Sequence, residues 1–500
     1  MEKQKKYFCA PNGEFSAART ILTGFGFMAA SIAWAIYDPY ITKILNRLLT
    51  DSATVTAWSN KLNAMFPVLA EFAKTQGEDV TTAAGGITLV PLFIGIIMTF
   101  DNIFGVIFQP TFGKLSDRCH SKLGKRRPFI LFGAPISAVL FAAIPFVALT
   151  GSLAATMTLI IAFVFVMSLW RAPVVALMPD LTPPEMRSRG NAIINLMGGV
   201  GGFIGMVAGT IVTAVMVLIL GQGNFTEEQT FPYVFITGSV VMIIGMLVLR
   251  IRVQEEDSRL IVQGETNKAQ DAAAKRKAEK EAEKAEKAAR KAEKLPKGKR
   301  RSLTAMLAGL FFLSCGTSAI TTFFALFAAE VLGKETKDAT IMMAVFAVFS
   351  AVAALPAGKL GVKIGRKKTI LLGLGVFMVV FLLYVATHSL TLIWVALIFG
   401  GAANMFITVN TLPLVLEIGG ADKVGTFTGY YYTATFSAQI ASPILYGMVR
   451  MFSASYMSLF YYSPVAFLLA ILCIFCVKHG EADTSWVEAA AEKAREENED

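Results

Sequence analysis

A series of apolar stretches, each long enough to cross a lipid bilayer, occupies most of this 500-residue chain. A spanning helix needs about 20 mostly apolar residues to match roughly 30 Å of hydrocarbon. Hydrophobic residues make up 55% of the sequence and its mean hydropathy is +0.58, which is more apolar surface than a water-soluble protein can bury. We therefore predict an all-α polytopic membrane protein, and we expect its few intramembrane polar residues to carry its function.

The apolar stretches predict twelve transmembrane helices. They lie at 17–38, 87–112, 129–150, 156–178, 192–220, 232–251, 303–330, 339–361, 369–387, 390–416, 424–449 and 456–477. Their length favours helices over a β-barrel, whose strands alternate in polarity and run for only about 10 residues. The predicted architecture is two six-helix halves with a linker and a tail. The first half is 1–251, with a long outer loop at 41–86; a charged linker at 252–302, the second half at 303–477 and a tail at 478–500 follow.

Basic residues gather in alternate loops and predict the orientation of the chain. The loops after the second, fourth and eighth spans are basic, whereas those near 150–155 and 387–390 contain no Lys or Arg. Because short basic loops favour the cytoplasm, we expect both termini there and the protein in the cell membrane. The net charge of +10 is concentrated in the linker, which favours anionic lipid headgroups over nucleic acid. We expect a monomer in the lipid bilayer, with no nucleic-acid partner and no cofactor.

Each half carries a glycine-rich basic loop after its second span. Such repetition is typical of transporters built from two six-helix halves. Glycine permits a tight turn between helices, and an acid among the cations can pair with one of them and hold neighbouring helix ends together. We predict a cytoplasmic gate formed by Gly113, Asp117, Arg118, Gly124, Arg126, Arg127, Gly358 and Arg366. The alternative is a loop that only sets the topology.

The first of these loops carries a family resemblance. The segment Gln109 to Leu131, QPTFGKLSDRCHSKLGKRRPFIL, resembles the major facilitator superfamily, and within it the sucrose-transporter branch of the glycoside–pentoside–hexuronide:cation symporter family. Segments around Trp34, from Pro173 to Leu181 and from Glu330 resemble further elements of that family. The resemblance implies the major facilitator fold and transport of a sugar with a cation. The cation-binding aspartates of the family correspond to Gly105 and Gln109 here, so the coupling ion does not follow from the resemblance.

Asp101 is a charged residue in the middle of the second span. A charge at mid-bilayer costs roughly 2.5–3.5 kcal/mol, so its side chain should face a cavity or a partner. Arg171, at a similar depth in the fourth span, is the natural partner. We predict that Asp101 and Arg171 couple transport to a proton, and the resemblance adds Glu330 as a further candidate. A static ion pair that only stabilises the bundle is the alternative.

Trp34, Tyr37 and Asp38, near the predicted outer end of the first span, suit a sugar. Aromatic faces pack against the C–H groups of a sugar ring, and polar groups hydrogen-bond its hydroxyls. The alternative is an interfacial aromatic belt with a solvated acid. Additional predicted substrate ligands, for which helix packing is the alternative, are Asn102, Gln109, Asn404, Asn410 and Gln439. The glycine-rich stretch 198–209 predicts close helix packing.

These features predict a secondary active transporter that moves a sugar or glycoside into the cell with a proton, which is favoured over sodium. A disaccharide such as sucrose or maltose is favoured, on the resemblance. The chain has no ATP-binding motif, so an ion gradient is expected to drive transport. A proton-coupled exporter or antiporter of another solute on the same fold is the main alternative. A membrane enzyme is disfavoured because the three histidines lie far apart in the sequence, and the linker and tail offer no output domain for a sensor.

Overall fold

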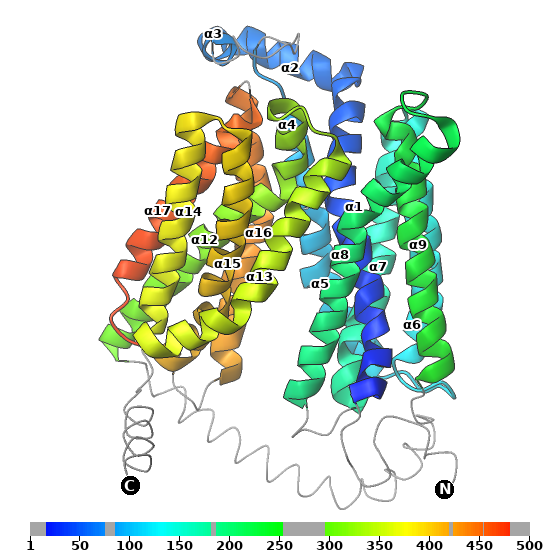
Figure 1. Ribbon diagram of the computed structural model, residues 1–500, viewed down its shortest axis with the longest axis vertical. Coiled ribbons are helices and arrows are strands. Elements are labelled where there is room, and N and C mark those ends of the chain that lie inside the picture. The colour runs from blue at the N-terminus through cyan, green and yellow to red at the C-terminus, as the bar shows by residue number, and fades with distance from the viewer. Residues whose placement is uncertain are drawn as a thin grey trace, which may run out of the picture. The chain divides into compact units, whose positions relative to one another are not determined.

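The computed structural model describes residues 17–75, 86–181, 187–253, 296–419, 424–453 and 455–480. Every regular element in these ranges is a helix (Figure 1). The helices that precede the predicted linker are α1 (Ala17–Thr50), α2 (Ala53–Met65), α3 (Pro67–Thr75), α4 (Val90–Met98), α5 (Phe100–Asp117), α6 (Arg127–Leu149), α7 (Leu153–Leu181), α8 (Arg187–Leu220) and α9 (Glu227–Arg252). Those that follow it are α12 (Lys297–Val331), α13 (Thr336–Ile364), α14 (Arg366–Thr387), α15 (Leu390–Gly419), α16 (Val424–Phe452), η4 (Tyr456–Ser458) and α17 (Leu459–Phe475). Most of the predicted linker and tail lies outside the described residues.

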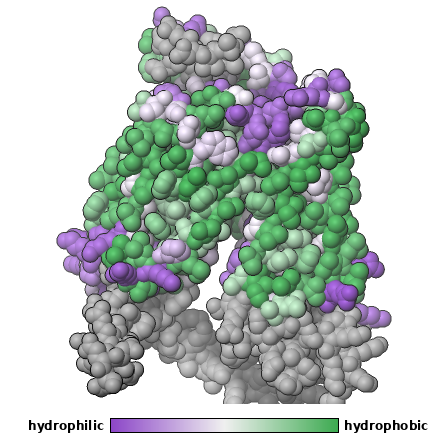
Figure 2. Space-filling view, in the orientation of Figure 1, coloured by the Kyte–Doolittle hydropathy of each residue, from purple (hydrophilic) through white to green (hydrophobic). Residues whose placement is uncertain are grey.

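Eleven helical segments of the described chain are long and apolar enough to cross a membrane. The helices α4 and α5 together form one of them, as do η4 and α17. Helix α16, which is not among the eleven, occupies the place of the remaining predicted span. Hydrophobic residues cover the middle of the helices, and hydrophilic residues gather toward their ends (Figure 2). The predicted all-α fold of twelve transmembrane helices in two six-helix halves is confirmed.

The first span is longer than predicted. Helix α1 does not end at residue 38 but continues to Thr50, so Asp38 lies inside the helix rather than at its outer end. The extension is helical because its apolar face stays buried: Ile41, Leu45 and Leu48 are at most 3% exposed. Part of the predicted outer loop is also helical, since α2 and α3 lie across the direction of the spans (Figure 1).

Contacts divide the described residues into two compact units. Unit 1 contains the residues up to 253 together with 322–341 and 451–453, and unit 2 contains 296–321, 342–450 and 455–480. Within unit 1, α1 packs against α8 and α9, α6 against α7 and α9, and α5 against α7. Within unit 2, α14 packs against α15 and α17. The end of α12 (322–331) and the start of α13 (336–341) therefore belong to unit 1, while the rest of both helices belongs to unit 2.

Glycines bring α8 against the backbone of α1, as the glycine-rich stretch predicts. A Cβ atom at Gly201 would lie 2.3 Å from the carbonyl oxygen of Met28, and one at Gly205 would lie 3.0 Å from that of Ile32. Only a residue without a side chain allows two helix backbones to approach this closely. The contact holds the middle of α1 firmly in unit 1, and this part of α1 leads directly into Trp34, Tyr37 and Asp38.

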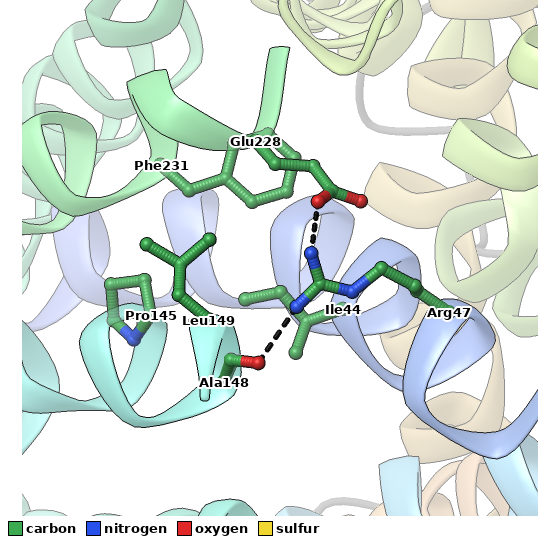
Figure 3. A pocket seen from close by; sticks show the side chains of 7 residues that line it. All are labelled: Ile44, Arg47, Pro145, Ala148, Leu149, Glu228 and Phe231. Atoms are coloured by element: carbon green, nitrogen blue, oxygen red, sulfur yellow. Dashed lines mark hydrogen bonds and ion pairs between the residues drawn. The ribbon is translucent and has the colours of Figure 1, made fainter. Parts of the chain in front are cut away.

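Arg47 anchors the far end of α1 to two other helices (Figure 3). Its guanidinium forms an ion pair with Glu228 of α9 and donates a hydrogen bond of 2.7 Å to the carbonyl of Ala148 in α6. Apolar side chains, including Ile44 and Phe231, surround the pair and leave a cavity of only about 10 Å³. The last turns of α1 are thus fixed to α6 and α9, which explains why the helix continues to Thr50.

Candidate functional site

Two carboxylates and one guanidinium gather inside unit 1. Asp38 comes from α1, Asp101 from α5 and Arg171 from α7. All three are partly buried, and the charge of Arg171 acts on both carboxylates. No direct ion pair joins Arg171 to either of them in the described part of the chain. The structure therefore brings the predicted coupling residues Asp101 and Arg171 together and adds Asp38, which we had expected to act on the substrate alone.

A break in the second span supplies hydrogen bonds to Asp101. Thr99 separates α4 from α5, and its hydroxyl donates a hydrogen bond of 2.7 Å to the carbonyl of Ile96. Asp101 thus lies in the first turn of α5, where backbone N–H groups are free and the helix dipole favours negative charge. Its carboxylate accepts the backbone N–H of Asn102, and the Asn102 side chain donates to Oδ1 at 3.0 Å. These hydrogen bonds stabilise the ionised form of Asp101 within the span, where little water is available to solvate it.

Aromatic rings form one wall of this cluster. The rings of Trp34 and Tyr37 meet edge to face at 5.3 Å, and Tyr37 stacks on Phe163 of α7 at 5.7 Å. The guanidinium carbon of Arg171 lies 5.6 Å from the centre of the Trp34 ring, a cation–π contact. We did not predict Phe163, because a phenylalanine in an apolar span gives no sequence signal beyond burial. The wall places flat apolar surfaces beside the three charged groups.

Two hydrogen-bonding atoms in the aromatic wall are buried and unpaired. Among the described residues, neither Nε1 of Trp34 nor the hydroxyl oxygen of Tyr37 has a hydrogen-bond partner. Tyr37 is fully buried, and an unsatisfied buried polar group costs about 1–3 kcal/mol. The indole N–H can donate, and the phenol can donate or accept. Such groups are suited to a ligand that carries hydroxyls.

Other predicted substrate residues lie in different settings. The amide nitrogen of Gln109 is 3.1 Å from where a Cβ of Gly105 would be, so its side chain bends back along α5. Asn404 on α15 and Gln439 on α16 are half-buried in unit 2. Glu330 is half-buried in the last turn of α12, within unit 1.

Asn410 fastens α15 to α13. Its side chain is 3% exposed, and its amide donates to the carbonyls of Ala357 at 3.2 Å and Phe406 at 2.9 Å. A Cβ atom added at Gly361 would lie only 1.8 Å from the side-chain oxygen of Asn410. In this structure both donors of Asn410 are occupied by backbone, which favours the helix-packing alternative for this residue.

Arg126 joins three helices at the basic end of unit 1. It is 6% exposed, and its Nε donates to Asp180 at the end of α7 at 2.8 Å. It also pairs with Asp117 and donates to the Gly113 carbonyl at 3.2 Å. Burial lowers the pKa of Arg126, but the hydrogen bond to Asp180 and the charges of both acids outweigh it, so the pKa is raised. The guanidinium stays charged and holds the ends of α5, α6 and α7 together.

Of the other predicted gate residues, Gly124, Arg127 and Arg118 lie close to Arg126 or Asp117 in the chain, whereas Gly358 belongs to unit 2. Gly124 has a φ of +96°, a left-handed conformation that glycine adopts at little cost. Arg127, next to Arg126, donates to the carbonyl of Arg250 at the end of α9 at 2.8 Å. Arg118 follows α5 and is exposed. Gly358 lies within α13, where a Cβ would be 3.8 Å from Val409.

Unit 2 repeats the same plan. Arg366, at the start of α14, forms an ion pair with Glu417 near the end of α15, as Arg126 does with Asp180. Lys367 donates to the Phe475 carbonyl at 3.0 Å, as Arg127 does to the carbonyl of α9. We did not predict the acids Asp180 and Glu417 as gate residues. Aligning the two halves of the sequence would have identified them. In each half, the acid lies at or near the end of the second span that follows the basic loop.

Comparison with known proteins agrees with this arrangement. The family profile described as Major Facilitator Superfamily matches residues 19–443 and 306–498. This chain belongs to the Major Facilitator Superfamily. It is therefore a multi-pass membrane transporter.

Curated relatives are sucrose transport proteins that match part of the chain. Sucrose transport protein SUC3 of Arabidopsis thaliana is 33% identical over 137 residues, which cover 23% of this chain and 23% of that protein. Sucrose transport protein SUT4 of Oryza sativa subsp. indica is 32% identical over 126 residues, which cover 21% of each. The matched segment thus spans less than a quarter of these relatives.

Solved structures share the fold over nearly the whole chain. A D-xylose-proton symporter has a TM-score of 0.59 at 14% identity, covering 91% of this chain and 96% of that one. A single-residue mutant of the nucleoside transporter NupG has a TM-score of 0.56 at 13% identity, covering 91% and 100%. At these identities the similarity shows the fold alone.

Proposed function

We propose that this transporter carries a sugar or glycoside into the cell together with a proton, by alternating access. A disaccharide such as sucrose or maltose is the favoured substrate. The observation that carries the proposal is the cluster of Asp38, Asp101 and Arg171 beside Trp34 and Tyr37. It joins a group that can take up a proton to a surface that suits a sugar. The partial similarity to sucrose transport proteins supports the same substrate class.

The charge balance of the cluster supports proton coupling. Two carboxylates share one guanidinium, so the cluster has an excess negative charge when both acids are ionised. Like charges in a site with little water cannot both be well stabilised, and a single bound proton removes the excess. A proton that arrives or leaves then changes how strongly Arg171 is held between α1, α5 and α7. This change links proton binding to the packing of the helices that line the site.

The aromatic wall supports sugar binding. A sugar ring presents C–H groups on its faces and hydroxyls around its edge, and the partly exposed ring of Trp34, beside the buried Tyr37, offers a matching aromatic surface. Their unpaired N–H and O–H groups would bond the hydroxyls. A bound sugar would thereby pair two groups that are costly to leave unpaired. Asn102, a predicted sugar ligand, donates a hydrogen bond to Asp101, so a change at the sugar would be felt at the proton site.

The two basic-end networks support the predicted gate. Arg126 and Arg366 tie helix ends together within the first and the second six-helix half, respectively, so each half can move as a body in alternating access. We place these networks on the cytoplasmic side, with both termini, because basic loops favour that side.

Transport assays with purified protein in proteoliposomes test the proposal. Labelled disaccharides are supplied under a proton gradient or a sodium gradient imposed separately, and uptake against a sugar gradient is measured. Asp101→Asn should abolish uphill accumulation while sugar exchange at equal pH continues, because exchange needs no net proton movement. Asp51→Asn, at an exposed position after α1, is the matched control and should behave as the unmodified protein. Undiminished uphill uptake by Asp101→Asn would remove this residue from coupling.

A further inference from the structure

Helix α12 begins with a group of cations that have no acidic partners among the residues that the structure describes. Lys297, Arg300 and Arg301 are exposed, and the first turn of the helix contains no acid. Within the described ranges none of the three forms an ion pair. Cations at the start of a helix oppose its dipole, whose positive end lies there. An anion bound beside them would relieve both the mutual repulsion and the conflict with the dipole.

Helices α6 and α14 also begin with basic residues, but there the cations bind other groups of the protein. At the start of α6, Arg126 binds acids and Arg127 binds a helix-end carbonyl. At the start of α14, Arg366 binds Glu417 and Lys367 binds carbonyls at and beyond the end of α17. In both places the first two cations serve the packing of their own unit. The described residues give the side chains of Lys297, Arg300 and Arg301 no comparable packing role, which leaves their charge exposed.

The cations of α12 line a cavity that is wide open to its surroundings, and the described residues that line it all belong to one face of this helix. Its lining continues along the same helix face through Thr304 to Ala305 and Ala308. The distance along the helix from Lys297 to Ala308 is roughly 16 Å at 1.5 Å per residue. Charged groups therefore occupy one end of the cavity and small apolar residues the other.

A neighbouring face of the same turns packs against the residues that follow α17, which fixes this part of the helix. Ser302 is 2% exposed and accepts the backbone N–H of Lys478 at 3.1 Å. Its hydroxyl also lies 2.9 Å from Nδ1 of His479, and Gly298 packs against the same histidine ring. This packing orients Arg300 and Arg301 away from the bundle.

We propose that this cavity binds one anionic phospholipid, with its phosphate at Lys297, Arg300 and Arg301 and an acyl chain along Ala305 and Ala308. Arginine and lysine recognise phosphate through charge-assisted hydrogen bonds. The cations directly precede the apolar part of a spanning helix, which is the level of lipid phosphates in a bilayer. A lipid fits the polar-to-apolar gradient of the lining, whereas a soluble phosphate compound would use only the charged end.

Lipid binding to the purified full-length protein tests the proposal. Native mass spectrometry of delipidated protein in detergent measures binding of phosphatidylglycerol and phosphatidylcholine with identical acyl chains. Glycerol 3-phosphate, which has the headgroup phosphate without acyl chains, is a third probe. The test variant is Lys297→Gln/Arg300→Gln/Arg301→Gln. The control, which removes the same charge from exposed positions of α13 and α14, is Lys359→Gln/Lys363→Gln/Lys368→Gln.

We expect the unmodified protein to bind one phosphatidylglycerol at least about tenfold more tightly than phosphatidylcholine. The test variant should lose this preference and the control should keep it, while both elute as folded monodisperse protein. Equal preference in the test variant and the unmodified protein would overturn the proposal. Glycerol 3-phosphate binding as tightly as the lipid would also overturn it, because the ligand would then be a soluble phosphate compound.

Discussion

Replacing Gly201 with alanine should force α8 away from α1. The added Cβ would lie 2.3 Å from the carbonyl oxygen and 2.8 Å from the Cα of Met28. Because carbon atoms pack at about 3.5–4.0 Å, the helices would have to separate by about 1 Å. Both clashing atoms belong to the backbone, so no side chain can rotate to relieve them. Overpacking of this kind costs typically 1–3 kcal/mol, and we expect the free energy of unfolding to fall by about 2 kcal/mol.

Unfolding of the purified protein in a detergent titration measures this loss, with proteoliposome uptake as a second assay. Because α1 carries Trp34, Tyr37 and Asp38, its displacement should also weaken sugar uptake. Gly202→Ala is the matched control, since no atom lies within 4 Å of its added Cβ. Alanine there should be neutral or stabilising by up to about 1 kcal/mol, because alanine favours helix over glycine. Equal destabilisation at both positions would refute the close α1–α8 contact.

Three further substitutions test the gate, the packing and the sugar site. Asp180→Asn should lower the free energy of unfolding by about 1 kcal/mol, since Arg126 loses a charged acceptor that is partly screened by solvent. An unchanged melting temperature would argue against a stabilising role for the Arg126–Asp180 ion pair. Asn410→Leu should destabilise by about 1–2 kcal/mol through two lost hydrogen bonds with no change in the KM for sugar, whereas a raised KM would restore Asn410 as a ligand. Tyr37→Phe should leave stability equal or slightly higher, because the hydroxyl is unpaired, and should raise the KM by about tenfold; an unaltered KM would contradict its contact with the sugar.

Much of the fold follows from the sequence because the bilayer sets strict limits. Hydrocarbon thickness fixes the length of each span, so apolar runs locate the helices and reveal the two halves. The cost of charge in the membrane singles out Asp101 and Arg171. The glycine-rich stretch around Gly201 likewise predicts a close helix contact, since small residues are what such contacts require.

Tertiary structure decided which groups meet. The extension of α1 to Thr50 depends on burial against α6 and α9, which hydropathy along one segment does not register. The stacking of Phe163 on Tyr37 and the pairing of Arg126 with Asp180 likewise arise between elements that are distant in the sequence. Sequence alone determines that a charge or polar group within a span needs a partner, because lipid cannot solvate it. Only the packed helices determine whether that partner is a backbone carbonyl, as for Asn410, or a cluster like that of Asp38, Asp101 and Arg171.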